Sequence, residues 1–327
     1  MTYIKIKSRL IYLLTIFGCV VFLLYGSATA QASSSIITSH YLMNGGCGDI
    51  YRNLELTKPN MAGTDVLELQ ERLIEIGFSV PTNGVYDKNT AKVIKKFKII
   101  NGLEPTTEVG LRTWEALGKG VPTSSSKNNK AEKPQGNVSL LIEVTERKLT
   151  VFSDNQVFES FSVAIGKDET PTPHGEFKVI SKGAWGGGFG TRWNGLNVPW
   201  GIYGIHGTNK PWSIGRYASH GCIRMHNKDV ETLFPWVPIG TPVKIINNNL
   251  APNESISRTI KIKSSGQLTV FIQEALKKQG FLLGMADGRF GNATALAVKY
   301  FQAYNSLPIT GEIDPATYEM LMKKEEK

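Results

Sequence analysis

One cysteine and three histidines stand close together in the second half of the chain. His206 precedes the run Ser219-His220-Gly221-Cys222, and His226 follows it. A thiol has a pKa near about 8.5 and an imidazole near about 6.5, so a histidine that contacts the sulfur can accept its proton. The thiolate that results is a strong nucleophile. The residue types and their spacing therefore indicate covalent catalysis at a carbonyl carbon.

Spacing alone leaves two histidines as candidates for the base. His220 lies two residues before Cys222, so in an extended strand both side chains would point to the same face. His206 belongs to a preceding strand and could pair with Cys222 across a sheet. Gly221 would permit a tight backbone turn, and amide groups near Cys222 could then bind the oxyanion of the intermediate.

A zinc site is the enzymatic alternative, because His206, His220, Cys222 and His226 are all permissible zinc ligands. Two observations count against it. His220 and Cys222 flank a single glycine instead of forming a paired-ligand knuckle, and the sequence has no His-Glu-x-x-His motif. Both observations argue against a zinc site. For His226 we expect a structural role, since Asn227 is a plausible N-cap of a helix that runs to Phe234.

The elements that must position these residues are predicted to be strands. Apolar residues alternate with polar ones in the middle segment, a turn is expected at 146–148, and the alternation then resumes. Glycine and tryptophan are concentrated between 183 and 204, where they could line a cleft or pack around tight turns. The alternating apolar residues are Val138, Leu140, Ile142, Val144, Leu149, Val151, Phe161, Val163 and Ile165.

Both ends of the chain carry a copy of one helical module. Residues 65–118 match residues 266–322 at an offset of 203, which becomes 204 after one inserted loop residue. Apolar residues recur at intervals of three and four, which predicts a bundle of three helices in each copy. The polar segments 119–136 and 248–265 are predicted linkers. The recurring residues of the first copy are Val66, Leu69, Leu73, Ile76, Val93, Ile94, Phe97, Ile100, Leu111, Trp114 and Leu117.

Two families resemble these patterns. His206-Gly207, followed by Ser219-His220-Gly221-Cys222-Ile223-Arg224, is similar to the signature of the L,D-transpeptidase catalytic domain, also called the YkuD domain, and the similarity extends over 137–247. The Leu-Gln-x-x-Leu, Gly-Phe and Phe-Gln patterns of the modules resemble the peptidoglycan-binding repeat. The first copy has Phe97-Lys98 where the second has Phe301-Gln302. The resemblance implies a multidomain protein, in which a mostly-β, sandwich-like mixed sheet stands between two small all-α bundles.

The resemblance also implies a reaction and a role for each matching residue. Cys222 would form a thioester with a peptidoglycan stem tetrapeptide and release D-Ala, and His206 would be the base, oriented through the backbone of Gly207. The acyl group would pass to the amine of another stem, which links the third positions of two stems, or to water. The implied reaction needs neither a metal nor an organic cofactor. Supporting, oxyanion or substrate-binding roles would fall to His220, Gly207, Gly221, Ser219, Arg224 and Tyr203. The alternatives are a zinc-dependent cell-wall peptidase and a peptidoglycan-binding protein without catalysis.

The first thirty residues have the pattern of a secretory signal peptide. Lys5, Lys7 and Arg9 precede an uncharged run over 10–25, and small residues follow to Ala32. Cleavage after residue 30 or 32 is expected, and an uncleaved membrane anchor is the alternative. Removing 1–30 takes away three basic residues and no acidic one, which lowers the formal charge from +9 to +6.

Composition restricts the compartment and the partners. Three cysteines in 327 residues do not make a disulfide scaffold, and Cys222 has no obvious partner. The basic residues are scattered, which argues against nucleic acid. We expect a monomer that is secreted or held in the bacterial cell wall, with peptidoglycan as its partner. Contact with a membrane is expected only through the N-terminal segment, if that segment is uncleaved.

Overall fold

The computed structural model describes residues 52–125, 132–184 and 186–323, all within one compact unit that spans 47–327. The predicted signal segment, Cys19 and Cys47 lie outside the described residues. Within the described part of the chain, no helix is both long enough and apolar enough to span a membrane.

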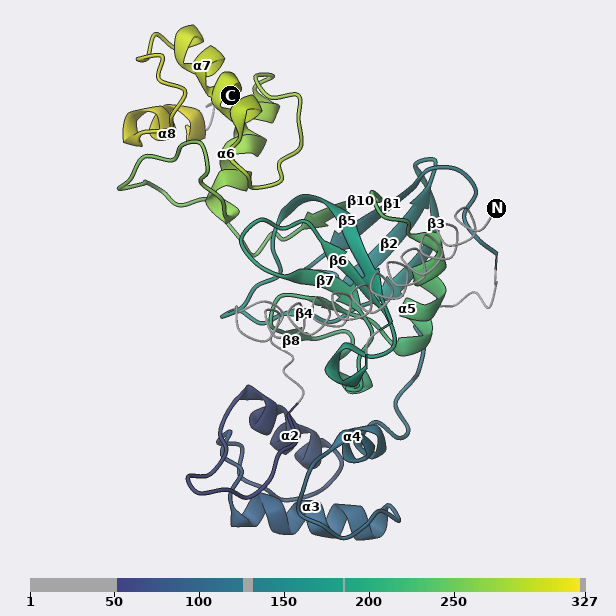
Figure 1. The fold of residues 1–327 in the computed structure, drawn as a ribbon. Helices are drawn as coiled ribbons and strands as arrows, with labels where there is room; N and C mark the ends of the chain where they lie inside the picture. The colour runs from purple at the N-terminus through teal and green to yellow at the C-terminus, as the bar shows by residue number, and fades with distance from the viewer. Residues whose placement is uncertain (1–51, 126–131, 185, 324–327) are drawn as a thin grey trace, which may run out of the picture. The chain divides into compact units, whose positions relative to one another are not determined.

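An eight-stranded mixed sheet forms the middle of the chain (Figure 1), with the order β3-β2-β1-β10-β5-β6-β7-β9. Its neighbours pair antiparallel except for two parallel pairs, β1 with β10 and β7 with β9. The predicted mixed sheet is therefore confirmed. The two remaining strands, β4 and β8, form a separate parallel pair. The bounds are β1 Val138–Glu143, β2 Lys148–Ser153, β3 Gln156–Ser162, β4 Ile165–Gly166, β5 Gly175–Gly183, β6 Trp193–Leu196, β7 Tyr203–His206, β8 Tyr217–Ser219, β9 Ile223–Arg224 and β10 Pro242–Ile246.

Burial follows the alternation that the sequence predicts. On β1 the side chains of Leu140 and Ile142 are buried, and on β2 those of Leu149 and Val151 are buried, so one face of each strand points into the core. Helix α5 (Asn227–Leu233) adds Val230 and Leu233 to the same core. Removing this apolar surface from water is the main force that holds the sheet and α5 together.

The predicted helical modules are present at both ends (Figure 1). The first contains α2 (Thr64–Glu75), α3 (Lys88–Ile100) and α4 (Leu111–Leu117), and the second contains α6 (Gln267–Lys278), α7 (Asn292–Tyr304) and α8 (Pro315–Met322). Each copy is closed by two isolated β-bridges at matching positions. These bridges are Leu54–Val109 and Ala62–Val85 in the first copy, and Ile260–Ile313 and Ser265–Arg289 in the second.

The glutamine of the Leu-Gln-x-x-Leu pattern braces the loop after the first helix of each copy. Gln70 is fully buried; its carbonyl oxygen accepts from the amide of Gly84, and its amide donates to the carbonyl of Val85. Gln273 makes the same contacts with Gly288 and Arg289. Gly84 and Gly288 have φ of 68° and 75°, a backbone region that favours glycine. The pattern is therefore explained by the architecture of the module.

The departure at Phe97-Lys98 also has a structural account. In the second copy, Gln302 is buried and its carbonyl oxygen accepts from the amide of Gly311, which fixes the loop before α8. In the first copy, Lys98 occupies this position and donates to the hydroxyl of Thr106 at 2.6 Å. Burial lowers the pKa of Lys98, partly against the pull of Glu108 and Glu104. The first copy thus holds its second loop by a different contact.

Three local expectations are corrected. Ile100 and Leu111 lie in the predicted apolar stripes, but they are 65% and 42% exposed because they stand at helix ends, beyond the reach of the core. The N-cap of α5 is His226, not Asn227, whose side chain instead accepts from the amide of Thr191. Ile256 and Ile260 fall in the predicted second linker, but they pack into the core of the C-terminal bundle.

The brace predicts a large loss of local stability for Gln273→Ala. Removing the Gln273 side chain leaves the Gly288 amide and the Arg289 carbonyl without their partner. Each unsatisfied group costs about 1–3 kcal/mol of stability. Hydrogen exchange of the intact chain should show a free energy of opening for α6 that is lower by about 3 kcal/mol. Lys278→Ala, an exposed change on the same helix, is the control. Equal protection in both variants would contradict the bracing role.

Candidate active site

The parallel ladder between β7 and β9 brings the signature residues together. It aligns Ile205 with Ile223 and His206 with Arg224, and the amide of Met225 donates to the carbonyl of His206 at 2.8 Å. Cys222 directly precedes β9, two residues before Arg224. His206, Cys222 and Arg224 are all 0% exposed. The structure therefore gathers residues from two separate segments at one buried place, and the choice of His206 as the base stays a prediction.

A hydrogen bond to the backbone fixes which ring nitrogen of His206 carries a proton. Its Nδ1 lies 2.6 Å from the carbonyl oxygen of Gly207. Because a carbonyl oxygen can only accept, Nδ1 must carry the proton, and Nε2 of the neutral ring then presents a lone pair. The backbone of Gly207 is itself held, since its amide donates to the carbonyl of Arg192 at 3.1 Å. This is the arrangement that a general base requires.

Trp193 is a site residue that sequence reasoning did not single out. It lies directly opposite His206 in the β6–β7 ladder, and the two rings stack with centroids 5.6 Å apart. Trp193 and Cys222 also form one buried apolar cluster, against which Phe189 packs. A Cβ on Gly204 would lie 2.6 Å from the Trp193 ring, so glycine is needed there. The concentration of Gly and Trp in 183–204 was the available signal.

The turn before Cys222 depends on Ser219 and Gly221. The Ser219 hydroxyl accepts from the amide of Gly221 at 3.1 Å and donates to the carbonyl of Cys222 at 2.5 Å. Gly221 has φ of 105°, and a Cβ there would lie 2.8 Å from the ring of Tyr203. The predicted tight turn is confirmed. The Gly221 amide faces Ser219, however, so it does not fit the oxyanion-binding role considered for the amides near Cys222.

Cys222 is disulfide-bonded in this structure. Cys222 is the only cysteine among the residues that the structure describes. A sulfur in a disulfide has no thiolate, so the nucleophile must be released by thiol–disulfide exchange or another reduction.

The remaining predicted site residues surround this centre. His220 Nε2 lies 3.1 Å from the hydroxyl of Thr64 on α2. The Arg224 guanidinium lies 3.3 Å from the carboxylate of Glu68, also on α2, and its backbone is fixed by two hydrogen bonds to Ala164. Burial raises the pKa of the Tyr203 hydroxyl. The helical N-terminal module thus contacts two signature residues, which the sequence did not predict.

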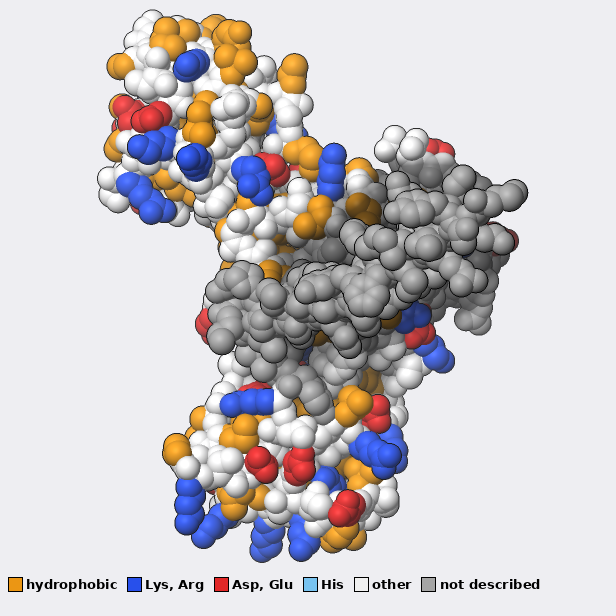
Figure 2. All heavy atoms as spheres, viewed as in Figure 1, with side chains coloured by type: hydrophobic (Ala, Val, Ile, Leu, Met, Phe, Trp, Pro, Cys, Tyr) orange, Lys and Arg blue, Asp and Glu red, His pale blue; other side chains and the backbone are white. Residues whose placement is uncertain are grey.

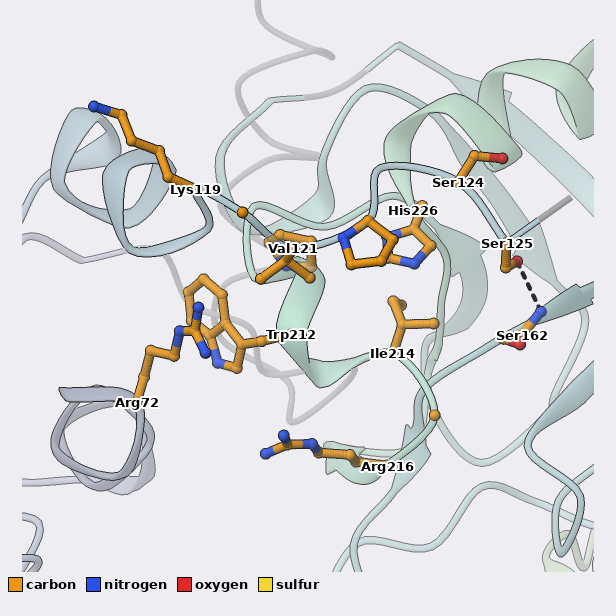
Figure 3. Close-up of a pocket in the computed structure, with 14 residues that line it drawn as sticks. Arg72, Lys119, Val121, Ser124, Ser125, Ser162, Trp212, Ile214, Arg216 and His226 are labelled. Carbon is orange, nitrogen blue, oxygen red and sulfur yellow. Dashed lines mark hydrogen bonds between the residues drawn. The ribbon is translucent and has the colours of Figure 1, made fainter. Parts of the chain in front are cut away.

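His226 lies apart from the centre, in the wall of a cavity of about 680 Å³ (Figure 3). Arg72, Trp212 and Arg216 line the same cavity, whereas Cys222 and His206 do not. Burial lowers the pKa of His226, and the nearby Asp229 opposes part of that shift. Among the residues that the structure describes, no three His, Cys, Asp or Glu side chains converge as a metal site. The four zinc ligands considered from the sequence are therefore not grouped as a ligand set.

Comparison with known families divides the chain into three matching regions. The profile of the L,D-transpeptidase catalytic domain matches residues 137–245. The profile of a peptidoglycan-binding domain matches twice, at 62–117 and 265–321. Both resemblances seen in the sequence are confirmed.

Individual proteins are similar over the middle region. The chain is 46% identical over 107 residues to the L,D-transpeptidase named YkuD of Bacillus subtilis, which is 32% of this chain and 64% of that protein. It is 38% identical over 130 residues to YqjB of the same organism, also named as an L,D-transpeptidase, covering 35% of this chain and 74% of that protein. Among solved structures, an L,D-transpeptidase from Mycobacterium smegmatis matches 34% of this chain and 59% of its own at 24% identity, with a TM-score of 0.30.

The disulfide predicts that reactivity at Cys222 depends on reduction. In unfolded but unreduced protein, iodoacetamide should leave Cys222 unlabelled, and after reduction it should label it fully. Peptide mapping by mass spectrometry measures both states and identifies the partner cysteine. Complete labelling without reductant would show that the bond does not form.

Proposed function

The chain belongs to the L,D-transpeptidase family, and from that membership we propose that it is a cysteine acyltransferase acting on peptidoglycan stem peptides. The observation that carries the proposal is the β7–β9 pairing, which brings the His206 strand beside the strand that Cys222 precedes, with Nδ1 of His206 hydrogen-bonded to the Gly207 carbonyl. The reaction, its substrates and the residue roles are inferred from this geometry together with the family.

The first half-reaction forms the thioester. His206 Nε2 accepts the proton of the reduced Cys222 thiol, and the thiolate attacks the carbonyl carbon that joins the third stem residue to the terminal D-Ala. The carbon–nitrogen bond breaks, and the imidazolium of His206 returns its proton to the amine of D-Ala as it leaves. The stem is now held on sulfur as an acyl group.

The second half-reaction regenerates the enzyme. The amine of another stem attacks the thioester, His206 accepts its proton, and the sulfur leaves as a thiolate that is then reprotonated. The product links the third positions of two stems. With water as acceptor, the same steps remove D-Ala by hydrolysis. No metal or organic cofactor enters either half-reaction.

The surroundings of His206 support this assignment of roles. Trp193 stacks on the ring and the Gly207 carbonyl accepts from Nδ1, so the imidazole has a fixed orientation and a fixed tautomer. The turn at Gly221 fixes the backbone before Cys222. A fixed base beside a fixed nucleophile reduces the entropy that must be lost in reaching the transition state.

The two helical modules are proposed to hold the enzyme on its polymer. In the N-terminal bundle, Lys and Arg side chains gather over α3 (Figure 2), where Lys88, Lys92, Lys95 and Lys96 are exposed. Such a face suits the carboxylates of stem peptides. Action on peptidoglycan places the protein outside the cytoplasm, and the signal segment at 1–30 is the proposed route of export.

Cys222→Ala should abolish both transfer and hydrolysis while the protein remains folded and bound to cell-wall sacculi. A nucleophile has no substitute in a covalent mechanism, so we expect a loss of about 10⁴-fold or more in D-Ala release. Chromatography of muropeptide products, with circular dichroism and sacculus pull-down as controls, measures this. Retained turnover would show that another residue is the nucleophile.

Deleting residues 266–327 should weaken the retention of the protein on sacculi while leaving the catalytic centre intact. The readouts are pull-down with purified sacculi and D-Ala release from a soluble tetrapeptide, which does not need anchoring. Unchanged retention would show that the C-terminal bundle does not bind the cell wall and serves only as a spacer.

A further inference from the structure

Helix α2 of the N-terminal bundle presents two polar side chains to the catalytic signature. Thr64 and Glu68 are one helical turn apart, so they share a face of the helix. The Thr64 hydroxyl lies 3.1 Å from His220, and the Glu68 carboxylate reaches Arg224 at 3.3 Å and Lys210 at 2.6 Å. One carboxylate of the bundle thus bridges two cations of the catalytic domain.

Further contacts hold the same face of α2 in place. Glu75 forms an ion pair with Arg216, and the Arg72 guanidinium lies over the ring of Trp212, 5.0 Å from its centroid (Figure 3). Trp114 of α4 stacks on Trp212 with centroids 6.1 Å apart. The contact of Glu68 is therefore part of a docked surface and not an isolated ion pair.

The ion pairs are largely withdrawn from water. The side chain of Arg224 is 0% exposed, and those of Lys210 and Glu68 are each 12% exposed. Buried guanidinium and ammonium groups are strongly destabilised without an anionic partner. If Glu68 leaves this place, the largely buried ammonium of Lys210 therefore favours another anion there.

We propose that Lys210 and Arg224 form the site that receives the terminal carboxylate of the donor stem, and that Glu68 occupies this site when no stem is bound. The proposal rests on the proposed function, in which the stem carries a D-Ala carboxylate one residue beyond the scissile carbonyl. Arg224 stands two residues from Cys222, on the strand that pairs with the His206 strand. A carboxylate bound there lies close to the reacting centre.

The exchange of one carboxylate for another couples the N-terminal bundle to the substrate. A stem that enters must displace Glu68, and this weakens the docking of α2 by some factor. By linkage, undocking the bundle from the catalytic domain must raise the affinity for the stem by that same factor. Glu68 is then an intramolecular competitor of the substrate.

The test compares Glu68→Gln with Glu71→Gln, an exposed carboxylate on the same helix, in the reduced full-length protein. Glu68→Gln should lower KM for a tetrapeptide stem by about tenfold with kcat nearly unchanged, a coupling of ordinary size, and Glu71→Gln should match the wild type. Lys210→Gln should raise KM. For a stem with a C-terminal amide in place of the carboxylate, Lys210→Gln should have no effect on KM.

Two kinetic results would overturn the proposal. A lower kcat/KM in Glu68→Gln would mean that Glu68 positions Arg224 for the reaction. An equal rise of KM in Lys210→Gln with the amide stem would mean that this site does not bind the terminal carboxylate.

Hydrogen exchange gives a readout that does not need catalysis. Glu68→Gln should speed exchange over 64–75 relative to Glu71→Gln, whether or not stems are turned over. Exchange that is equal in the two variants would show that Glu68 does not hold α2, even if turnover is normal. If no protein shows turnover but exchange is faster in Glu68→Gln, the proposed function is contradicted. The contact of Glu68 with Lys210 and Arg224 would then still be supported as the interaction that holds α2.

Discussion

The hydrogen bond from His206 Nδ1 to the Gly207 carbonyl is the interaction on which the site depends. It places the ring proton on one nitrogen and leaves the other to act as a base. The bond requires a particular backbone path at Gly207, where a Cβ would lie 2.2 Å from the side chain of Asn227. The sheet, through the pairing of β7 with β6 and β9, carries that path and sets Trp193 against the ring.

The residues of the site are also buried in this structure. His206, Cys222 and Arg224 are all 0% exposed, Cys222 is in a disulfide, and Glu68 contacts the two cations proposed to receive the donor stem. The low local dielectric strengthens each interaction, including those that must be broken before a stem can enter.

Much of the fold could be predicted from the sequence because the determining signals are local. The alternation over Leu140 and Ile142 predicts a strand, and the helical stripe of Leu69 and Leu73 predicts a bundle helix, since each depends on neighbours along the chain. The repeat itself could be seen by comparing the two ends. Cys222 and His206 were predicted from their chemistry and from a family signature. The helix-end residues Ile100 and Leu111 escaped the same method, because a periodic pattern does not indicate where the core ends.

The contacts that were missed are long-range and leave no periodic trace. Glu68 lies 142 residues from Lys210 and 156 from Arg224, and nothing in the sequence of α2 separates Glu68 from its exposed neighbour Glu71. The stacking of Trp193 on His206 depends on strand register, which a single sequence does not specify.

The central claim is that Cys222 carries the acyl group, and tandem mass spectrometry of the reduced enzyme mixed with a tetrapeptide stem tests it most directly. The account predicts release of D-Ala, a covalent stem adduct on the peptide that contains Cys222, and loss of both after prior alkylation of that thiol. An adduct on another residue, or release of D-Ala that survives alkylation of Cys222, would contradict it.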